Sequence, residues 1–386
     1  MLSALPALRL TGAHVLRDGA LRQRSVAVAE GLFTRGPLPV VDMSGYLVLP
    51  GIVDMNIGRV GVAWHGRADR VLREAGRAAA AAGVTTGHLV QGWSWASGAE
   101  APEQAAALAS ALARTGAEGA DLRLTLRCET HTVETATDLL ALAGTGAAAC
   151  VAFVNTLDDA LATASTRPED FAVSAACAGR SAEAHMDRIR TARKQQREVP
   201  RHLCRLAEAF DRLGIIYGSH GDPDGETRET FSMIGAKVCG DPASRAAAAL
   251  ARAVGDPVVL SADGLARGEA TQQARLAMDL MRDGHCDALM SGDSGPCLAA
   301  AAFRLSDVGV MPLQEAWALI STRPAEILRL PDRGRIAPGR RADLVAIHAE
   351  SRRIELTLSG GRITHLSGQA RERLMAADLP RTMAAE

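Results

Sequence analysis

The chain has 386 residues, 47% of them hydrophobic and 23% charged, which is enough to bury a large core and to form a large domain with a smaller one. Its 43 Lys and Arg nearly balance its 44 Asp and Glu, and the formal net charge of −1 argues against a nucleic-acid-binding or membrane-surface role. The N-terminus lacks a basic leader with an apolar core, and no stretch approaches the roughly 18 apolar residues of a membrane span.

The seven cysteines are odd in number and contain no Cys-x-x-Cys pair. This pattern favours reduced, mostly buried thiols over a disulfide framework or a zinc site. We therefore expect a cytoplasmic protein that has no nucleic-acid or membrane partner.

Short alternating segments at 7–16 and 24–36 predict β-strands near the N-terminus. A long alternation of apolar strands and alanine-rich helices follows. Eight strands are expected, at 51–56, 85–90, 122–128, 149–155, 215–220, 234–239, 257–262 and 287–291. Helices are expected between them, for example at 70–83, 101–116, 200–214, 244–255 and 271–284.

Repeated strand-helix units with apolar strands indicate a parallel sheet covered on both faces. Eight units over residues 50–334 favour a closed (β/α)8 TIM-like barrel, in the α/β class. A doubly wound sheet is the alternative, but no Gly-x-Gly-x-x-Gly turn follows the first strand. Residues 335–370 return to short strands and should pair with residues 1–49 in a small domain, whereas residues 371–386 should form a helix and a tail.

Functional side chains of such a barrel project from the carboxyl ends of its strands. Polar residues follow six of the expected strands, namely Asn56, His88 with Gln91, the run Cys128 to His131, Asn155 with Thr156, the run Ser219 to Asp224, and the run Ser291 to Asp293. Their clustering behind apolar runs predicts a site at this end of the barrel.

Three of these strand ends carry candidate metal ligands or acid–base groups. His220 with Asp222 could bind a divalent metal or supply a general base, or could be a solvated acidic turn. Glu129 and His131 share one strand face, although Glu129 could instead pair with Arg127. Asp293 could orient a metal-bound water, or could serve as a turn residue or helix cap.

Arg267 follows the seventh strand and, with Arg180 and Lys194, could contact a phosphate group, although loop arginines are more often simply solvated.

The segments "GYLVLPGIVDMN" (45–56) and "LISTRPAEILRLPDRGRIAPGRRADLVAI" (319–347) resemble the amidohydrolase superfamily. Further segments at 121–130, 199–222, 258–270 and 288–305 resemble its phosphonate-metabolism diphosphatase branch. The resemblance implies a metal-dependent barrel, a small β-sandwich built from both termini and, commonly, a homodimer. It also implies hydrolysis of a phosphorylated or phosphonate-bearing small molecule.

Position by position, the resemblance implies that Glu129, His220 and Asp293 are retained metal ligands, with Arg267 in the branch's Arg-Gly pattern. Asn56 stands where the branch has a first-strand His-x-Asp motif, and Asn155 stands where it has Asp-His.

These departures predict at most one divalent ion (Zn, Mn, Fe or Ni), held by Glu129, His220, Asp293 and Asp222, or no metal at all. Asp293 and His220 would be the catalytic residues. The substrate would be bound by Arg267, Arg180, Asn56 and Asn155. The hypotheses are a hydrolase with an altered metal site, an inactive paralogue that binds a ligand or partner protein, and metal-free acid–base catalysis by His220 and Asp293.

Overall fold

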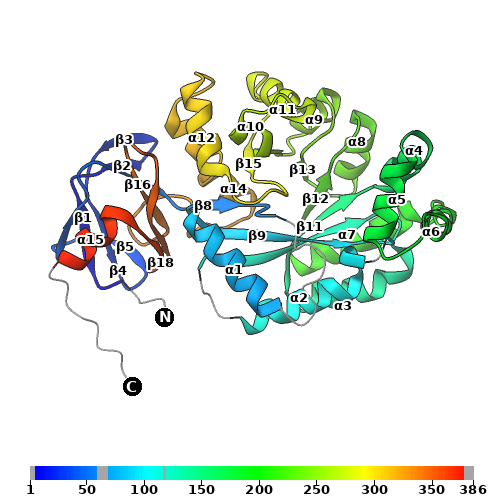
Figure 1. Cartoon of the computed structure of the whole chain (residues 1–386), viewed down its shortest axis with the longest axis horizontal. Helices are drawn as coiled ribbons and strands as arrows, with labels where there is room; N and C mark the ends of the chain where they lie inside the picture. The colour runs from blue at the N-terminus through cyan, green and yellow to red at the C-terminus, as the bar shows by residue number, and fades with distance from the viewer. Residues whose placement is uncertain (1–4, 59–67, 97, 116–118, 378–386) are drawn as a thin grey trace.

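The computed structural model describes residues 5–58, 68–96, 98–115 and 119–377. It shows a barrel beside a smaller domain, whose strands come from the N-terminal and C-terminal segments of the chain (Figure 1). Residues 378–386 of the predicted tail lie outside the described residues.

Two sheets form the small domain. The four-stranded sheet has the order β5-β4-β1-β6, and the six-stranded sheet has the order β18-β17-β16-β7-β2-β3. The strands are β1 (Leu8–Thr11), β2 (His14–Arg17), β3 (Ala20–Gln23), β4 (Val26–Ala29), β5 (Leu32–Thr34), β6 (Val40–Asp42), β7 (Tyr46–Pro50), β16 (Leu344–His348), β17 (Ile354–Ser359) and β18 (Arg362–Leu366). Helix α15 (Gly368–Ala376) packs on the same domain, since Ala370 and Leu374 belong to its core.

Eight parallel strands form the barrel in consecutive order, which confirms the predicted (β/α)8 class with a β-sandwich beside it. They are β8 (Ile52–Asp54), β9 (Val84–Trp93), β10 (Asp121–Glu129), β11 (Ala148–Val154), β12 (Ile216–His220), β13 (Val238–Gly240), β14 (Val258–Ser261) and β15 (Ala288–Met290). The sixth strand starts four residues later than predicted, because helix α8 (Gly225–Met233) runs up to Ile234 and a turn follows.

The first and last strands meet through single contacts rather than a ladder. The Gly292 amide donates to the Asn56 carbonyl at 3.0 Å. The Asp54 carboxylate accepts from the Ser291 amide at 3.0 Å and from the Ser291 hydroxyl at 2.5 Å. Asp54 therefore closes the barrel at the edge where the predicted site lies.

Helices cover the outside of the sheet. They are α1 (Ala68–Ala81), α2 (Pro102–Arg114), α3 (Ala136–Gly144), α4 (Leu157–Thr166), α5 (Pro168–Cys177), α6 (Ala182–Lys194), α7 (Val199–Leu213), α8, α9 (Arg245–Ala253), α10 (Asp263–Arg267), α11 (Gln272–Arg282), α12 (Leu298–Asp307), α13 (Leu313–Ala318) and α14 (Thr322–Ile327). Short 3-10 turns lie at Gly98–Glu100 and Val133–Thr135.

Helix α7 shows how the sequence places these elements. Its buried side chains, among them Leu203, Leu206 and Phe210, recur at helical spacing, so one stripe faces the sheet. Gly214 ends the helix with φ of 68°, a left-handed conformation that glycine adopts without strain. The next strand then begins at Ile216.

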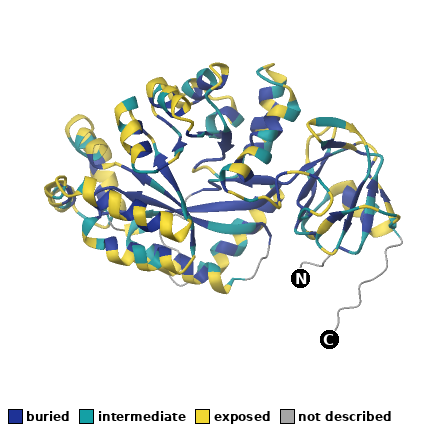
Figure 2. Ribbon diagram, turned by 180° about the vertical axis from the view of Figure 1, so that it is seen from behind, coloured by how far each residue is buried: buried dark blue, intermediate teal, exposed yellow. Residues whose placement is uncertain are grey.

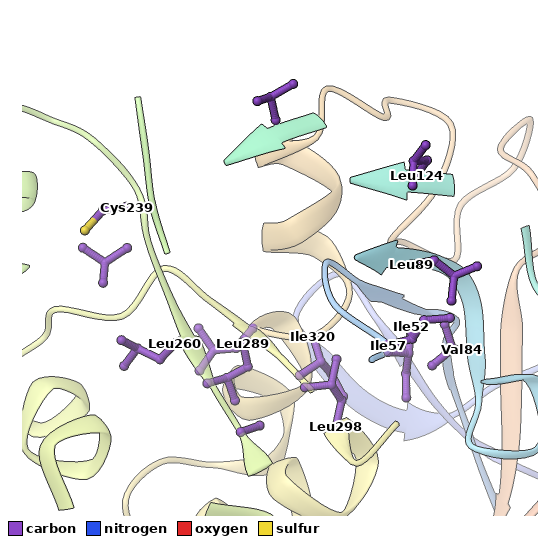
Figure 3. Packing of buried hydrophobic residues seen from close by; sticks show 14 of the residues in the cluster. Ile52, Ile57, Val84, Leu89, Leu124, Cys239, Leu260, Leu289, Leu298 and Ile320 are labelled. Carbon is purple, nitrogen blue, oxygen red and sulfur yellow. The ribbon is translucent and has the colours of Figure 1, made fainter. Parts of the chain in front are cut away.

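The main core lies between the strands and their helices. Figure 3 labels some of its side chains, among them Ile52, Leu89, Leu260 and Leu289. Figure 2 shows the same pattern, with buried strands and helices that are exposed on their outer faces. The two domains are joined by polar contacts as well: on β17, the Thr357 hydroxyl donates to the Ala80 carbonyl at 2.8 Å and the Ser359 hydroxyl donates to the Thr85 carbonyl at 3.1 Å. The barrel is therefore a packed scaffold that fixes its strand ends.

Within the described residues, no helix combines the length and the apolar character needed to cross a bilayer. All seven cysteines lie in the described part of the chain and are free thiols. Cys128, Cys150 and Cys239 are buried, whereas Cys177 and Cys204 are exposed, so fewer are buried than predicted.

Candidate functional site

The strand ends β8, β10 and β15 bring three polar side chains together. The Asn56 side-chain amide donates to Asp293 Oδ1 at 3.4 Å, and Arg127 Nη1 lies 4.0 Å from Asp293 Oδ2. Asn56 and Arg127 are buried, whereas the Asp293 side chain is 52% exposed. The site is thus a buried amide and a buried guanidinium that face one accessible carboxylate.

Local hydrogen bonds hold Asn56 in this position. Its backbone amide donates to Asp54 Oδ1, and its side-chain oxygen accepts from the Gly58 amide, both at 3.0 Å. Complete burial raises the pKa of Asp54 to about 6, although the hydrogen bonds from Ser291 and Asn56 oppose that rise. The side-chain oxygen of Asn56, the atom that could bind a metal ion, already accepts the hydrogen bond from the Gly58 amide.

A cavity of about 60 Å³ lies inside the barrel below these residues. Asn56, Arg127 and His220 contribute polar groups to its wall from β8, β10 and β12, and Val90, Val259 and Met290 are among the apolar side chains around them. The predicted residues Asn56 and His220 thus line one interior space together with Arg127. Electrostatic interactions between charged groups are stronger in such low-dielectric surroundings than in water.

The carboxylate of Glu129 lies in a different environment. It is 1% exposed, and its Oε2 accepts from the Thr156 amide at 2.7 Å and the Thr156 hydroxyl at 2.5 Å. Its Oε1 accepts from Thr130 Oγ1 at 3.1 Å and lies 3.4 Å from His131 Nδ1. Glu129 and His131 are close, as their spacing predicted, but protein donors occupy both carboxylate oxygens.

Asp222 serves a buried ion-pair network. Its Oδ2 accepts from the Ser219 hydroxyl at 2.6 Å and from Arg228 Nη1 at 3.3 Å. Arg228 is fully buried and also lies 3.4 Å from Asp256. Burial raises the pKa of Asp222, while Ser219 and Arg228 oppose that rise. As a metal ligand Asp222 does not fit this structure, because its carboxylate neutralises a buried guanidinium.

The predicted ligand set is therefore not assembled for a metal ion. Among the described residues, no group of three or more His, Cys, Asp or Glu side chains is arranged to hold one. With Glu129 and Asp222 held by protein donors, the four predicted ligands do not supply the three protein ligands of an ordinary catalytic zinc site. The residues present do not fit the metal centre that the resemblance implies.

Three predicted substrate-binding residues make structural contacts instead. Arg267 binds Asp263 and Glu269. Arg180 Nη1 donates to the Ala96 carbonyl at 2.5 Å, and Asn155 accepts from the Leu157 amide at 3.3 Å at the start of α4. These contacts do not bring the three side chains together around a common ligand. Asn56 alone of the predicted substrate-binding residues lines the barrel cavity.

The sequence interpretation missed two charged residues of this region. Arg127 was considered only as a partner of Glu129, yet it faces Asp293; its position two residues before Glu129 indicates the same inward face. Asp241 follows β13, accepts from the Ser261 amide at 3.1 Å, and burial raises its pKa. A polar residue directly after an apolar strand is the signal that could have identified Asp241.

Comparisons with known proteins agree with this fold. No family model matches the chain. Over 162 residues the chain is 31% identical to alpha-D-ribose 1-methylphosphonate 5-triphosphate diphosphatase of Escherichia coli (strain K12), which covers 42% of this chain. The chain spans 41% of the length of that curated relative.

Solved structures share the architecture over almost the whole chain. A Xaa-Pro dipeptidase has a TM-score of 0.63 with 14% identity, covering 92% of this chain and 99% of its own. Ochratoxinase of A. niger has a TM-score of 0.63 with 13% identity, covering 95% and 97%. A β-aspartyl dipeptidase from Fervidobacterium islandicum AW-1 has a TM-score of 0.60 with 16% identity, covering 94% and 98%.

These findings confirm the resemblance indicated by the sequence motifs. The chain shares its fold, a barrel with a β-sandwich domain, with these solved structures. Over part of its length it is also similar in sequence to a diphosphatase whose name includes a methylphosphonate and a triphosphate.

Proposed function

We propose that this protein binds a phosphate- or phosphonate-bearing small molecule at the carboxyl end of its barrel, without a binuclear metal centre. Arg127 carries the proposal. Its side chain is 9% exposed, lines the barrel cavity and lies 4.0 Å from the Asp293 carboxylate. Arginine suits phosphate oxygens because its planar donors can bind two of them at once.

The similarity to a diphosphatase whose name includes both a phosphonate and a triphosphate supports this class of ligand. The donor set favours binding over metal-dependent hydrolysis, because Glu129 and Asp222 are held by protein donors. The proposal therefore corresponds to a ligand-binding paralogue with the hydrolase fold. A cytoplasmic homodimer stays a prediction.

Hydrolysis with one metal is the second candidate. It rests on the position of His220 and Asp293, each at the carboxyl end of its strand, where catalytic groups of this fold class lie. It would require Asp293 to exchange its contact with Asn56 for the ion, and it would lack the third protein ligand of an ordinary catalytic zinc site.

Isothermal titration with ribose 5-phosphate, methylphosphonate and diphosphate tests the binding proposal. Arg127→Met should weaken binding of the preferred anion by about tenfold or more, since a charge-assisted hydrogen bond is lost. Arg267→Met is the matched control, because Arg267 is exposed and already bound to two carboxylates, and it should leave affinity unchanged. Equal affinity in Arg127→Met and wild type, or no anion binding, would reject the proposal.

The two candidates are separated by metal analysis and turnover. We expect well under one equivalent of Zn, Mn, Fe or Ni in purified protein, and no release of diphosphate from a ribose triphosphate after these metals are added. Metal-dependent turnover that Asp293→Asn abolishes would instead establish the hydrolase.

A further inference from the structure

A groove of about 550 Å³ lies along α14 and the loop that follows it, at the end of the barrel opposite Arg127. Arg333 fixes its place, because its guanidinium donates to Thr86 near the start of β9 and to Asp121, the first residue of β10. The amino-terminal ends of these barrel strands therefore lie behind the groove. Its volume is within the range of small-molecule binding sites, roughly 300–1,000 Å³.

Positive charge is concentrated on the wall of this groove. Four arginines and one glutamate are among its lining residues, namely Arg329, Arg333, Arg335, Arg340 and Glu326. The whole chain has a formal net charge of −1, so this excess of positive charge is local. A surface of one sign attracts ligands of the opposite sign, and the groove therefore favours an anion.

Protein carboxylates neutralise two of the four arginines, since Arg333 donates to Asp121 and Arg335 donates to Glu326 within the groove. Within the part of the chain that the structure describes, neither of the other two arginines makes an ion pair. The first of them, Arg329, is exposed, and the second, Arg340, is half-buried. Two accessible positive charges on the groove are thus left for a ligand.

The backbone of Arg329 is an independent sign that its side chain has a role. Its φ is 53°, in the left-handed region. Its amide donates to the Glu326 carbonyl at 3.1 Å, and the Leu330 amide donates to the Ala325 carbonyl at 2.8 Å, so the residue follows the end of α14 in a Schellman motif. Glycine is usual at this position, because any other side chain is strained there.

Arg352 has the same backbone conformation, with φ of 56°, and shows what such strain can serve. Its Nη2 donates to Asp307 at 2.8 Å, and its guanidinium carbon lies 4.9 Å from the centre of the Phe303 ring. These contacts offset the strained backbone. Arg329 makes no ion pair with a described residue, so an anion in the groove is the partner that would give its side chain an equivalent contact.

From these observations we infer that the groove along α14 is a second binding site, which takes a small molecule with two or more phosphate groups. A single exposed ion pair contributes little, so the ligand has to contact several arginines at once. Phosphate groups suit this arrangement, because a guanidinium can bind two of their oxygens together. The groove shares no lining residue with the barrel cavity, and the inference does not depend on the function proposed above.

Isothermal titration of the full chain with inorganic triphosphate tests the inference. We expect saturable binding that weakens as salt is added, because the arginines are accessible to solvent. Arg329→Gly and Arg340→Met should each weaken binding about three- to tenfold, since a charge-assisted contact is lost. Urea denaturation of Arg329→Gly should give the same midpoint as wild type or a higher one, because glycine adopts this conformation without strain. A purely structural role of Arg329 predicts the reverse, a lower midpoint with unchanged affinity.

Arg352→Gly is the matched control, because it replaces an arginine of the same backbone conformation outside the groove, and its affinity for triphosphate should equal that of wild type. Arg127→Met should retain the binding, which distinguishes the groove from the barrel cavity. The inference is overturned if triphosphate does not bind saturably, if Arg329→Gly and Arg340→Met both bind it as wild type does, or if Arg127→Met abolishes the binding.

Discussion

Two parts of the barrel rim use their acidic side chains in opposite ways. On the side formed by β10 to β12, Glu129 and Asp222 are buried and hydrogen-bonded by Thr156, Ser219 and Arg228. Where β15 meets β8, Asp293 is half exposed and faces Asn56 and Arg127. Carboxylates at equivalent strand ends can therefore be structural on one side and accessible to a ligand on the other. Burial and partners decide which, because a buried charge must be compensated by the protein itself.

The largest expected effect on stability is on the side formed by β10 to β12, where the carboxylates are buried. Asp222→Ala should lower the free energy of unfolding by about 3–5 kcal/mol, because it removes a carboxylate partner of a fully buried arginine. Chemical denaturation measures this loss. Asp224→Ala, two residues along the same loop, is the control and should cost about 1 kcal/mol, since Asp224 only caps α8 through the Thr227 amide. Similar losses in the two variants would mean that Asp222 is not structural.

An intermediate effect on stability is expected from Asp54, which links the first and last barrel strands through Ser291, close to Asn56 and Asp293. Its pKa rises from 3.8 to about 6 on folding, because burial disfavours the charged form. Between those values the folded state holds more protons than the unfolded state, so the contribution of Asp54 to stability falls as pH rises. The fall amounts to roughly 3 kcal/mol.

Urea denaturation of wild type and Asp54→Asn between pH 4 and pH 7 measures this term, since the difference removes titrations that the two proteins share. Wild type should lose stability relative to the variant across that interval. A difference that is constant with pH, or that grows in favour of wild type, would contradict the raised pKa.

The smallest expected effects on stability come from replacing one carboxylate on each side of the rim by its amide. Glu129→Gln should destabilise the protein by about 1–3 kcal/mol, because an amide nitrogen replaces an oxygen that accepts from Thr156. Asp293→Asn should change stability by less than about 0.5 kcal/mol, as is usual for accessible positions. Thermal and chemical denaturation of this matched pair measures the contrast. Equal losses, or a larger loss for Asp293→Asn, would remove the distinction between the two sides.

The sequence by itself determined the architecture. Eight apolar runs alternating with helical segments can bury both faces of a sheet in few ways, so the barrel could be predicted, and the short strands at the two ends of the chain indicated a second domain. It also located the polar strand ends, because side chains at the carboxyl ends of barrel strands meet at one rim. The proximity of Asn56 and Asp293 agrees with that rule, whereas Glu129 with His131 was predicted from the alternation of side chains along one strand.

Only the tertiary structure decided what each rim residue contacts. Thr156 reaches Glu129 from the end of the neighbouring strand β11, and Arg228 reaches Asp222 from the following helix. Arg127 turns to Asp293, which is far away in the sequence and close in space. Strand periodicity fixes the face on which a side chain lies, whereas its partner depends on long-range packing and on the need to neutralise buried charge.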